Sequence, residues 1–200
     1  MKPSQGLEPG SIPGLRIKLK MKISKTALTF IILGLIIVTL IGYKMAQNKD
    51  TKVLLETNYG NITLQLRGDM PITSGNFKSL VEKGTYNGVI FHRVINGFMI
   101  QGGDPTRTGY GDPKIPNIKD EFLGSQKNNR GTIAMANAGP NTGSSQFFIN
   151  LVNNNFLDGK HPVFGDVVQG MDVVDKIAQV PVGQNDRPIT EVKIIKASLI

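Results

Sequence analysis

Residues 91–104, FHRVINGFMIQGGD, place an arginine among large apolar side chains. Side chains alternate along an extended strand, so Phe91, Arg93 and Ile95 are predicted to share one face. A guanidinium on an apolar face is unfavourable unless a polar partner or a ligand receives it. The simpler alternative is a surface arginine whose stem covers an apolar patch. The stretch is therefore a candidate binding site.

The rest of this stretch offers the other parts of such a site. Phe98 and Met99 would supply an apolar floor, and Gln101 is a neutral polar side chain able to orient an arginine. Gly102 and Gly103 allow the backbone to turn sharply or to approach a ligand closely.

Two further stretches strengthen the case for a functional site. Residues 131–150, GTIAMANAGPNTGSSQFFIN, combine two strand patterns with a loop of Gly, Pro and Asn, and residues 156–165 read FLDGKHPVFG. With FHRVINGFMIQGGD, they resemble the cyclophilin-type peptidyl-prolyl cis-trans isomerases, over essentially residues 52–200. The resemblance implies an eight-stranded barrel capped by two helices, and isomerisation of X-Pro peptide bonds.

The resemblance also implies roles for individual residues. The family's catalytic arginine corresponds to Arg93, and its proline-ring pocket to Phe98, Met99, Phe148 and Leu157. The remaining implied substrate-binding positions are Gln101 and Gln146 at the polar rim, Ala136, Asn137 and Ala138 along the peptide backbone, His161 at the pocket edge, and Phe156.

Phe156 is a departure from the family pattern. Many relatives that are sensitive to cyclosporin carry tryptophan at this position. Phenylalanine lacks the indole N–H donor, so the resemblance implies cyclosporin binding that is weakened, with catalysis unaffected.

The implied chemistry suits these residue types. Resonance holds the X-Pro amide planar, and rotation about it costs about 18–20 kcal/mol. Twisting localises a lone pair on the prolyl nitrogen, and a permanent cation such as Arg93 would stabilise that state more than the planar one. No bond breaks and no proton moves. We therefore expect no cofactor and no metal.

Other kinds of active site are disfavoured. Ser144, Ser145, Asp158 and His161 could be assembled into a hydrolase triad, but no nucleophile elbow surrounds the serines. The chain has two histidines and no cysteine, which makes a metal site improbable. It also lacks the GxxxxGK[ST] phosphate loop.

The positive charge is concentrated near the N-terminus. Residues 1–52 hold nine Lys/Arg and two acidic residues, a net of +7, whereas residues 53–200 hold fourteen and thirteen, a net of +1. A nearly neutral main domain argues against nucleic-acid binding.

The segment Thr26–Tyr43 contains 18 residues without a charge, between Lys25 and Lys44. Its helical length of about 27 Å approaches the thickness of a bilayer core, and no small-x-small cleavage site follows. The segment predicts a single-pass signal-anchor, with secretion after signal cleavage as the alternative. The excess of basic residues before it predicts a cytoplasmic N-terminus and an extracytoplasmic catalytic domain.

The predicted organisation has four parts. A basic cytoplasmic segment covers residues 1–25. Its first twenty residues are either native, an upstream extension or an artefact. A transmembrane helix covers 26–43, a linker 44–51, and the isomerase domain 52–200.

Period-two alternation in NITLQLR, joined to VLLET by a turn at Tyr59-Gly60-Asn61, predicts an opening hairpin. Helices are predicted in PITSGNFKSLVEKG, residues 71–84, and in MDVVDKIA, residues 171–178. Short apolar runs predict the other strands. The predicted fold is mainly β, a closed eight-stranded antiparallel barrel capped by two α-helices.

The leading functional hypothesis is a membrane-anchored prolyl isomerase that assists the folding of exported proteins. Its partners would be proline-containing peptides and unfolded or folding proteins, and we expect a monomer. The alternative is a non-catalytic proline-peptide binding module or holdase. Retention of Arg93 beside a complete pocket favours the enzyme.

Overall fold

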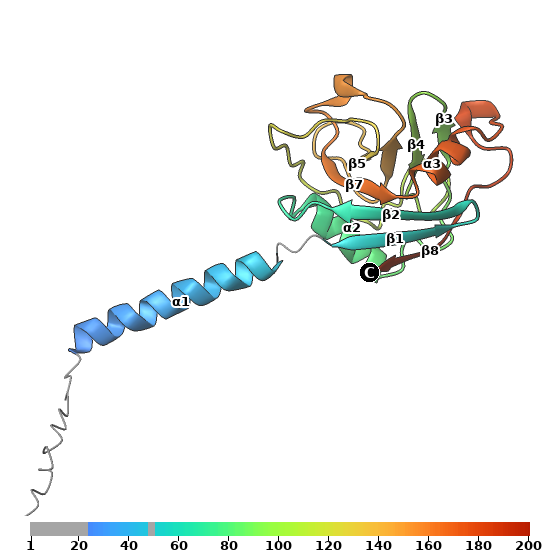
Figure 1. The fold of residues 1–200 in the computed structure, drawn as a ribbon. Helices are drawn as coiled ribbons and strands as arrows, with labels where there is room; N and C mark the ends of the chain where they lie inside the picture. Colours follow the sequence, from blue (N-terminus) through green and yellow to red (C-terminus); the bar gives the residue numbers. More distant parts are fainter. Residues whose placement is uncertain (1–23, 48–50) are drawn as a thin grey trace, which may run out of the picture. The chain divides into compact units, whose positions relative to one another are not determined.

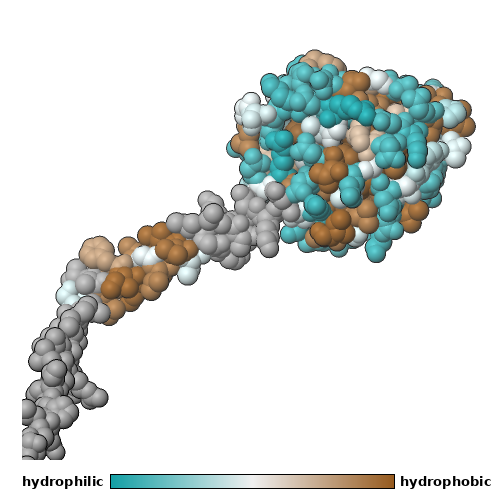
Figure 2. Space-filling model, viewed as in Figure 1, coloured by the Kyte–Doolittle hydropathy of each residue, from teal (hydrophilic) through white to brown (hydrophobic). Residues whose placement is uncertain are grey.

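The computed structural model describes residues 24–47 and 51–200. The chain divides into two compact units between Lys44 and Met45, and each is described by itself. Most of helix α1, Lys25–Gln47, belongs to the first unit, and its described side chains at residues 28–39 are exposed. Most of these side chains are apolar, and this part of the helix is largely coloured hydrophobic in Figure 2.

The expectation of a membrane-spanning signal-anchor is wrong. A span needs about 20 consecutive, predominantly apolar residues. Within residues 24–47 and 51–200, no helix is long and apolar enough to cross a membrane. This finding overturns the prediction of a single-pass protein anchored by residues 26–43 with an extracytoplasmic domain.

The second unit is built on one antiparallel sheet of eight strands, which curls around a core (Figure 1). The hydrogen-bonded order is β3-β4-β6-β5-β7-β2-β1-β8. The strands are β1 Lys52–Thr57, β2 Gly60–Leu66, β3 Arg93–Ile95, β4 Met99–Gly102, β5 Thr132–Met135, β6 Phe147–Asn150, β7 Val163–Gln169 and β8 Ile194–Leu199.

The opening hairpin forms where the alternation predicts it. Val53 pairs with Leu64 and Leu55 with Ile62, and all four side chains are fully buried. The turn lies at residues 58–59, one residue earlier than predicted, because the ladder closes at Gly60. The alternation therefore directs one face of the hairpin into the core.

Two α-helices pack against the sheet. Helix α2, Thr73–Glu82, contacts β7 and β8, and α3, Met171–Ala178, contacts β2, β3 and β4. Both lie within the predicted segments. After α2 the chain turns at Gly84, whose φ of 69° favours glycine. Two 3-10 turns, η1 Asn155–Leu157 and η2 Gln184–Asp186, lie in the later loops.

An aromatic cluster fills the interior. Its neighbouring ring centroids are 4.9–6.1 Å apart, and the hydroxyl of Tyr86 donates a hydrogen bond to the carbonyl of Ser145 at 3.0 Å. Each fully buried ring stabilises the fold by about 1.5–3 kcal/mol. The members are Phe77, Tyr86, Phe91, Phe147 and Phe164.

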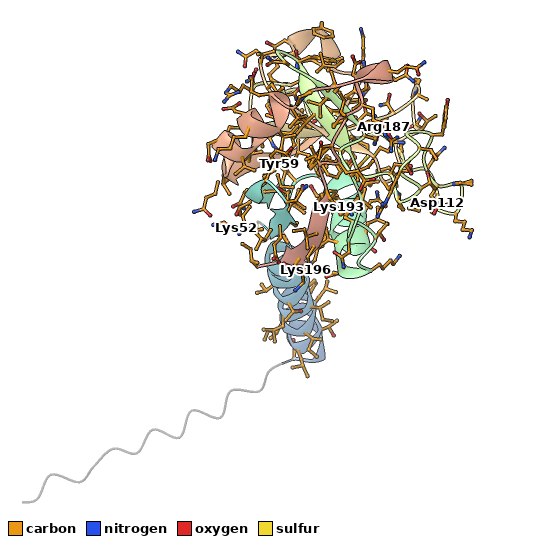
Figure 3. The ribbon with its side chains drawn as sticks, turned by 90° about the vertical axis from the view of Figure 1, so that its right-hand side faces the viewer. Lys52, Tyr59, Asp112, Arg187, Lys193 and Lys196 are labelled. Atoms are coloured by element: carbon orange, nitrogen blue, oxygen red, sulfur yellow. The ribbon has the colours of Figure 1, made fainter. Side chains whose placement is uncertain are left out.

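The barrel closes less completely than predicted. The edge strands β3 and β8 are not neighbours in the sheet, and the seam is an isolated bridge between Ile90 and Lys193, which is labelled in Figure 3. The amide of Phe91 also donates to the carbonyl of Val192 at 2.9 Å. Because regular strand geometry begins only at Arg93, Phe91 points into the core and does not share the arginine's face.

The turn after β4 depends on Gly103, whose φ is 86°. A Cβ there would lie 2.5 Å from the Ser145 carbonyl oxygen and 2.7 Å from the Phe147 ring. We expect Gly103→Ala to lower the free energy of unfolding by about 2–5 kcal/mol, from left-handed strain plus overpacking. Urea unfolding measures the change.

Gly97→Ala is the matched control, because Gly97 has a φ of 73° and a Cβ added there would meet no atom within 4 Å. Gly97→Ala should lower the free energy of unfolding only by the cost of the left-handed conformation, about 1–2 kcal/mol. Equal losses for the two variants would contradict the role of close packing at Gly103.

Candidate functional site

The strand register places four site residues in one row. Arg93 on β3 lies opposite Gln101 on β4, Gln101 lies opposite Phe148 on β6, and Phe148 lies opposite Ala134 on β5. Residues directly opposite in antiparallel strands share a face. This is the outer face of the sheet, away from the aromatic interior. A cation, an amide and an aromatic ring therefore stand next to one another.

A small apolar cluster forms the floor beside this row. Met99 and Phe148 are 2% and 4% exposed, so little of either ring or thioether surface faces solvent. Phe98 and Leu157 are partly buried and pack against them. All four residues of the implied proline pocket thus meet in one cluster. Its other members are Ala134, Val163, Ile95 and Ala136.

Two ring contacts form the edge of the floor. The His161 ring meets Phe148 edge-on, with centroids 5.4 Å apart, and its Nδ1 lies 3.1 Å from the Met135 carbonyl oxygen. Phe156 stacks on Phe98 at 5.9 Å and leaves 64% of its surface exposed. Phe156 therefore lies at the outer border of the apolar floor.

Arg93 is held at the other border. Its side chain is 43% exposed, and its Nε donates a hydrogen bond to Oδ2 of Asp186 at 3.3 Å. Among the residues that the structure describes, Asp186 is the hydrogen-bond partner of this guanidinium, and it binds Nε alone. The terminal nitrogens remain available to a ligand.

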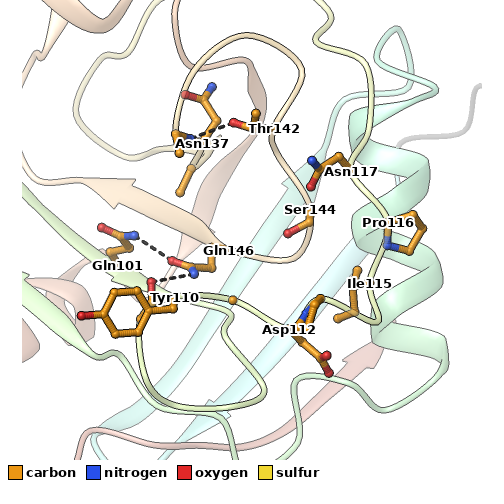
Figure 4. A pocket seen from close by; sticks show the side chains of 15 residues that line it. Gln101, Tyr110, Asp112, Ile115, Pro116, Asn117, Asn137, Thr142, Ser144 and Gln146 are labelled. Atoms are coloured by element: carbon orange, nitrogen blue, oxygen red, sulfur yellow. Dashed lines mark hydrogen bonds between the residues drawn. The ribbon is translucent and has the colours of Figure 1, made fainter.

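The polar rim is a chain of hydrogen bonds, drawn in Figure 4. Nε2 of Gln101 donates to Oε1 of Gln146 at 2.9 Å, and Nε2 of Gln146 donates to the carbonyl of Gly109 at 3.0 Å. The chain fixes both amide orientations and ties β4 and β6 to the loop after Gly103.

The implied backbone rail has one free donor. The amide of Ala136 donates to the Gln146 carbonyl at 3.0 Å, and that of Ala138 donates to Oγ1 of Thr142 at 2.8 Å. The Asn137 side chain is held by the Lys160 carbonyl at 2.8 Å. Within the described part of the chain, the backbone N–H of Asn137 has no protein acceptor, so it can donate a hydrogen bond to a peptide carbonyl.

A cavity of about 600 Å³ opens next to the rim (Figure 4). Five of the implied site residues line it, namely Gln101, Ala136, Asn137, Ala138 and Gln146. The rest of its lining comes from residues 109–113 and 115–117, Thr142 and Ser144, which the sequence did not assign to the site. Two glycines and two prolines in residues 109–117 were the available signal of a loop shaped for a ligand.

A buried carboxylate organises that loop. Asp104 is 0% exposed and accepts hydrogen bonds from the amides of Thr106, Gly109 and Gly111 at 2.9, 2.7 and 3.2 Å. The hydroxyls of Thr106 and Thr108 also donate to it. Burial raises the pKa of Asp104, but these hydrogen bonds outweigh it and hold the pKa below its ordinary value.

A buried asparagine network borders the apolar floor, because Asn150 on β6 lies opposite Met99 on β4. Nδ2 of Asn154 donates to the Phe98 carbonyl at 2.9 Å and to Oδ1 of Asn150 at 2.8 Å. Asn150 donates in turn to Oδ1 of Asn128 at 3.2 Å, and Asn128 donates to the His161 carbonyl at 3.3 Å. The network joins the backbone on both sides of the floor. Sequence reasoning missed it, although asparagine pairs and triplets mark these loops.

Arg93 has a neutral neighbour. Burial lowers the pKa of His92, the charge of Asp104 raises it, and the charges of Arg187 and Arg93 lower it further, for a net decrease. His92 is therefore uncharged at neutral pH, and it adds no second cation beside Arg93. Across the described residues, no group of three or more His, Asp or Glu side chains is placed to hold a metal ion.

Comparison with known proteins now identifies the family. The family model described as cyclophilin type peptidyl-prolyl cis-trans isomerase matches residues 52–199. The chain belongs to the cyclophilin family. It therefore carries a peptidyl-prolyl cis-trans isomerase domain, and the resemblance found in the sequence is confirmed.

Several cyclophilins are closely similar. A Neurospora crassa protein named peptidyl-prolyl cis-trans isomerase-like 1 is 47% identical over 154 residues, which cover 75% of this chain and 94% of that protein. The human protein of the same name is 48% identical over 149 residues, covering 72% and 90%. These relatives thus consist almost entirely of the cyclophilin domain.

Solved cyclophilin structures share the fold. A crystal structure of a Cryptosporidium parvum cyclophilin type isomerase superposes with a TM-score of 0.72 at 34% identity, covering 76% of this chain and 98% of that one. A second crystal structure of it, in the presence of the dipeptide Ala-Pro, gives 0.71 at 35% identity, covering 74% and 98%.

The depressed pKa of Asp104 makes the stability of the cyclophilin domain dependent on pH. Its stabilisation is fully present above the unfolded pKa, about 3.8, and is lost as the pH falls through the lower folded pKa. Asp104→Asn should lower the free energy of unfolding at pH 7 by about 2–3 kcal/mol, through lost charged hydrogen bonds.

Urea unfolding between pH 2.5 and 7 tests this expectation. The difference between wild type and Asp104→Asn should shrink below about pH 4, as the wild-type carboxylate becomes protonated. A difference that stays constant over the whole range would show that the charge of Asp104 does not organise the loop.

Proposed function

We propose that this domain accelerates rotation about X-Pro bonds in unfolded and folding proteins, with Arg93 as its catalytic residue. The observation that supports the proposal is the cross-strand row of Arg93, Gln101 and Phe148 beside the apolar floor. This arrangement offers a cation, a polar rim and an apolar surface to one dipeptide unit.

The floor would hold the pyrrolidine ring. A proline ring has no polar hydrogen and buries well against Met99 and Phe148, whose other sides are already packed. The free N–H of Asn137 would donate a hydrogen bond to a carbonyl of the substrate backbone. With the ring and the backbone held on either side of the prolyl bond, the rest of the peptide can rotate.

Arg93 would act on the twisted state. As the amide twists, the prolyl nitrogen gains a localised lone pair and becomes a hydrogen-bond acceptor. The terminal guanidinium nitrogens can donate to it without giving up the proton, because arginine stays charged at all physiological pH values. This hydrogen bond is absent when the amide is planar. It therefore stabilises the twisted state relative to the planar one and lowers the barrier to rotation.

Arg93→Ala tests this role. We expect kcat/KM to fall by about 10²–10³-fold, or about 3–4 kcal/mol, the range for a lost electrostatic donor. Peptide binding should change much less, because the floor is intact. Exchange NMR on an Ala-Pro peptide, added to the full chain, measures binding and isomerisation in one sample.

Phe148→Ala is the matched comparison, since it opens the floor and leaves the cation. It should weaken binding and turnover together. A wild-type protein that binds the peptide without accelerating exchange would contradict the enzyme and leave a non-catalytic binding module or holdase.

We further propose that Phe156 weakens binding of cyclosporin. Its ring stacks on Phe98 at the exposed border of the floor and has no polar hydrogen to donate. Phe156→Trp adds an indole N–H where 64% of the side chain is exposed, so the larger ring fits without disturbing the core.

We expect Phe156→Trp to tighten cyclosporin binding by about 1–2 kcal/mol, the range for one hydrogen bond with its packing. Isothermal calorimetry measures the affinity. Ile195→Trp on β8, 58% exposed, is the control for adding an indole elsewhere. Equal affinity of wild type and Phe156→Trp would rule out this explanation.

A further inference from the structure

The contact between Arg93 and Asp186 joins the catalytic strand to a distant turn. Asp186 is the last residue of η2 and follows Arg93 by 93 positions. Its Oδ2 accepts the hydrogen bond from Nε at 3.3 Å, and η2 packs against β3. This carboxylate is the polar partner that the apolar surroundings of Arg93 require.

The turn holds an unfavourable backbone conformation. Asn185 and Asp186 have φ values of 59° and 58°, in the left-handed region that non-glycine residues seldom adopt. Each such residue costs about 1–2 kcal/mol, and asparagine and aspartate are the residues that tolerate it best. Two in succession are maintained only when surrounding contacts determine the turn.

Those contacts are present on both sides of the turn. The amide of Gly183 donates to the Arg187 carbonyl at 2.8 Å, and Val182 bridges Pro188. Nη1 of Arg187 donates to the carbonyl of Arg107 at 3.0 Å, which ties the turn to the loop organised by Asp104. The backbone that carries Asp186 is therefore held in place by the protein's own contacts.

We propose that Asp186 is a positioning residue for isomerisation, and this inference rests on the proposed catalytic role of Arg93. By accepting from Nε, the carboxylate fixes the plane of the guanidinium and leaves its terminal nitrogens directed at the substrate. An unanchored arginine would lose more rotamer entropy on reaching the twisted state.

The contact acts by placing the guanidinium of Arg93 more than by the attraction between the two charges. The two side chains are 43% and 45% exposed, so water and salt screen the attraction between them. Exposed pairs of this kind contribute little to folding stability. Loss of the anchor should therefore appear in turnover, and not in unfolding.

Three variants separate the possibilities. Asp186→Gly removes the carboxylate and suits the left-handed backbone, so strain is not introduced. Asp186→Asn keeps an acceptor and tolerates the same backbone, but carries no charge. Asn185→Gly is the matched control, because it relaxes the neighbouring left-handed residue without touching Arg93.

We expect Asp186→Gly to lower kcat about two- to fivefold, the range for an exposed ion pair, with KM unchanged and urea stability not lowered. Asp186→Asn should restore most of the activity, and Asn185→Gly should match wild type. In an Arg93→Ala background, Asp186→Gly should have no further effect, since its only route to the reaction is through the arginine.

Two results would overturn the inference. One is wild-type kcat in Asp186→Gly together with a large loss in Arg93→Ala, in which case the catalytic role of Arg93 stands alone. The other is an Asp186→Asn protein faster than wild type, because the carboxylate would then restrain the arginine. An Arg93→Ala protein with full activity would instead refute the catalytic role of Arg93, on which this inference rests.

Discussion

The antiparallel register of β3, β4, β6 and β5 holds Arg93, Gln101, Phe148 and Ala134 side by side on the outer face of the sheet. Because side chains alternate with a period of two, a slip of one residue would turn this row inward and expose core residues such as Ile100. The interior aromatic cluster makes such a slip unfavourable. Packing of the core thereby sets the composition of the site on the opposite face.

Two buried hydrogen-bond networks order the loops that follow these strands. The Asp104 carboxylate organises the loop that lines the cavity, and the Asn150 network holds the backbone beside the apolar floor. Both are satisfied by several hydrogen bonds, as buried polar groups must be. The site therefore rests on rigid supports while its own surface stays largely apolar and partly exposed. That combination suits a reaction in which the enzyme only has to hold one part of a peptide while another part rotates.

The local features of the site could be predicted from the sequence, whereas the long-range ones could not. Alternation in FHRVI correctly placed Arg93 with Ile95, because backbone geometry alone sets that pattern. It misplaced Phe91, since no local signal shows where the strand begins. Asp186 meets Arg93 from a turn near the end of the chain, which only the closed course of the sheet brings close. The apolar run at 26–43 suggested a membrane span that the described helix does not provide.

The buried Asp104 carboxylate also determines how the loop after β4 exchanges its amide hydrogens. Loop amides usually exchange quickly, because they lack the protection of a regular ladder. The amides of Thr106, Gly109 and Gly111 are instead bound to a carboxylate that solvent does not reach. Slow exchange in this irregular segment follows from one side chain, so the cavity is bordered by a loop that behaves, on the timescale of exchange, like part of the sheet.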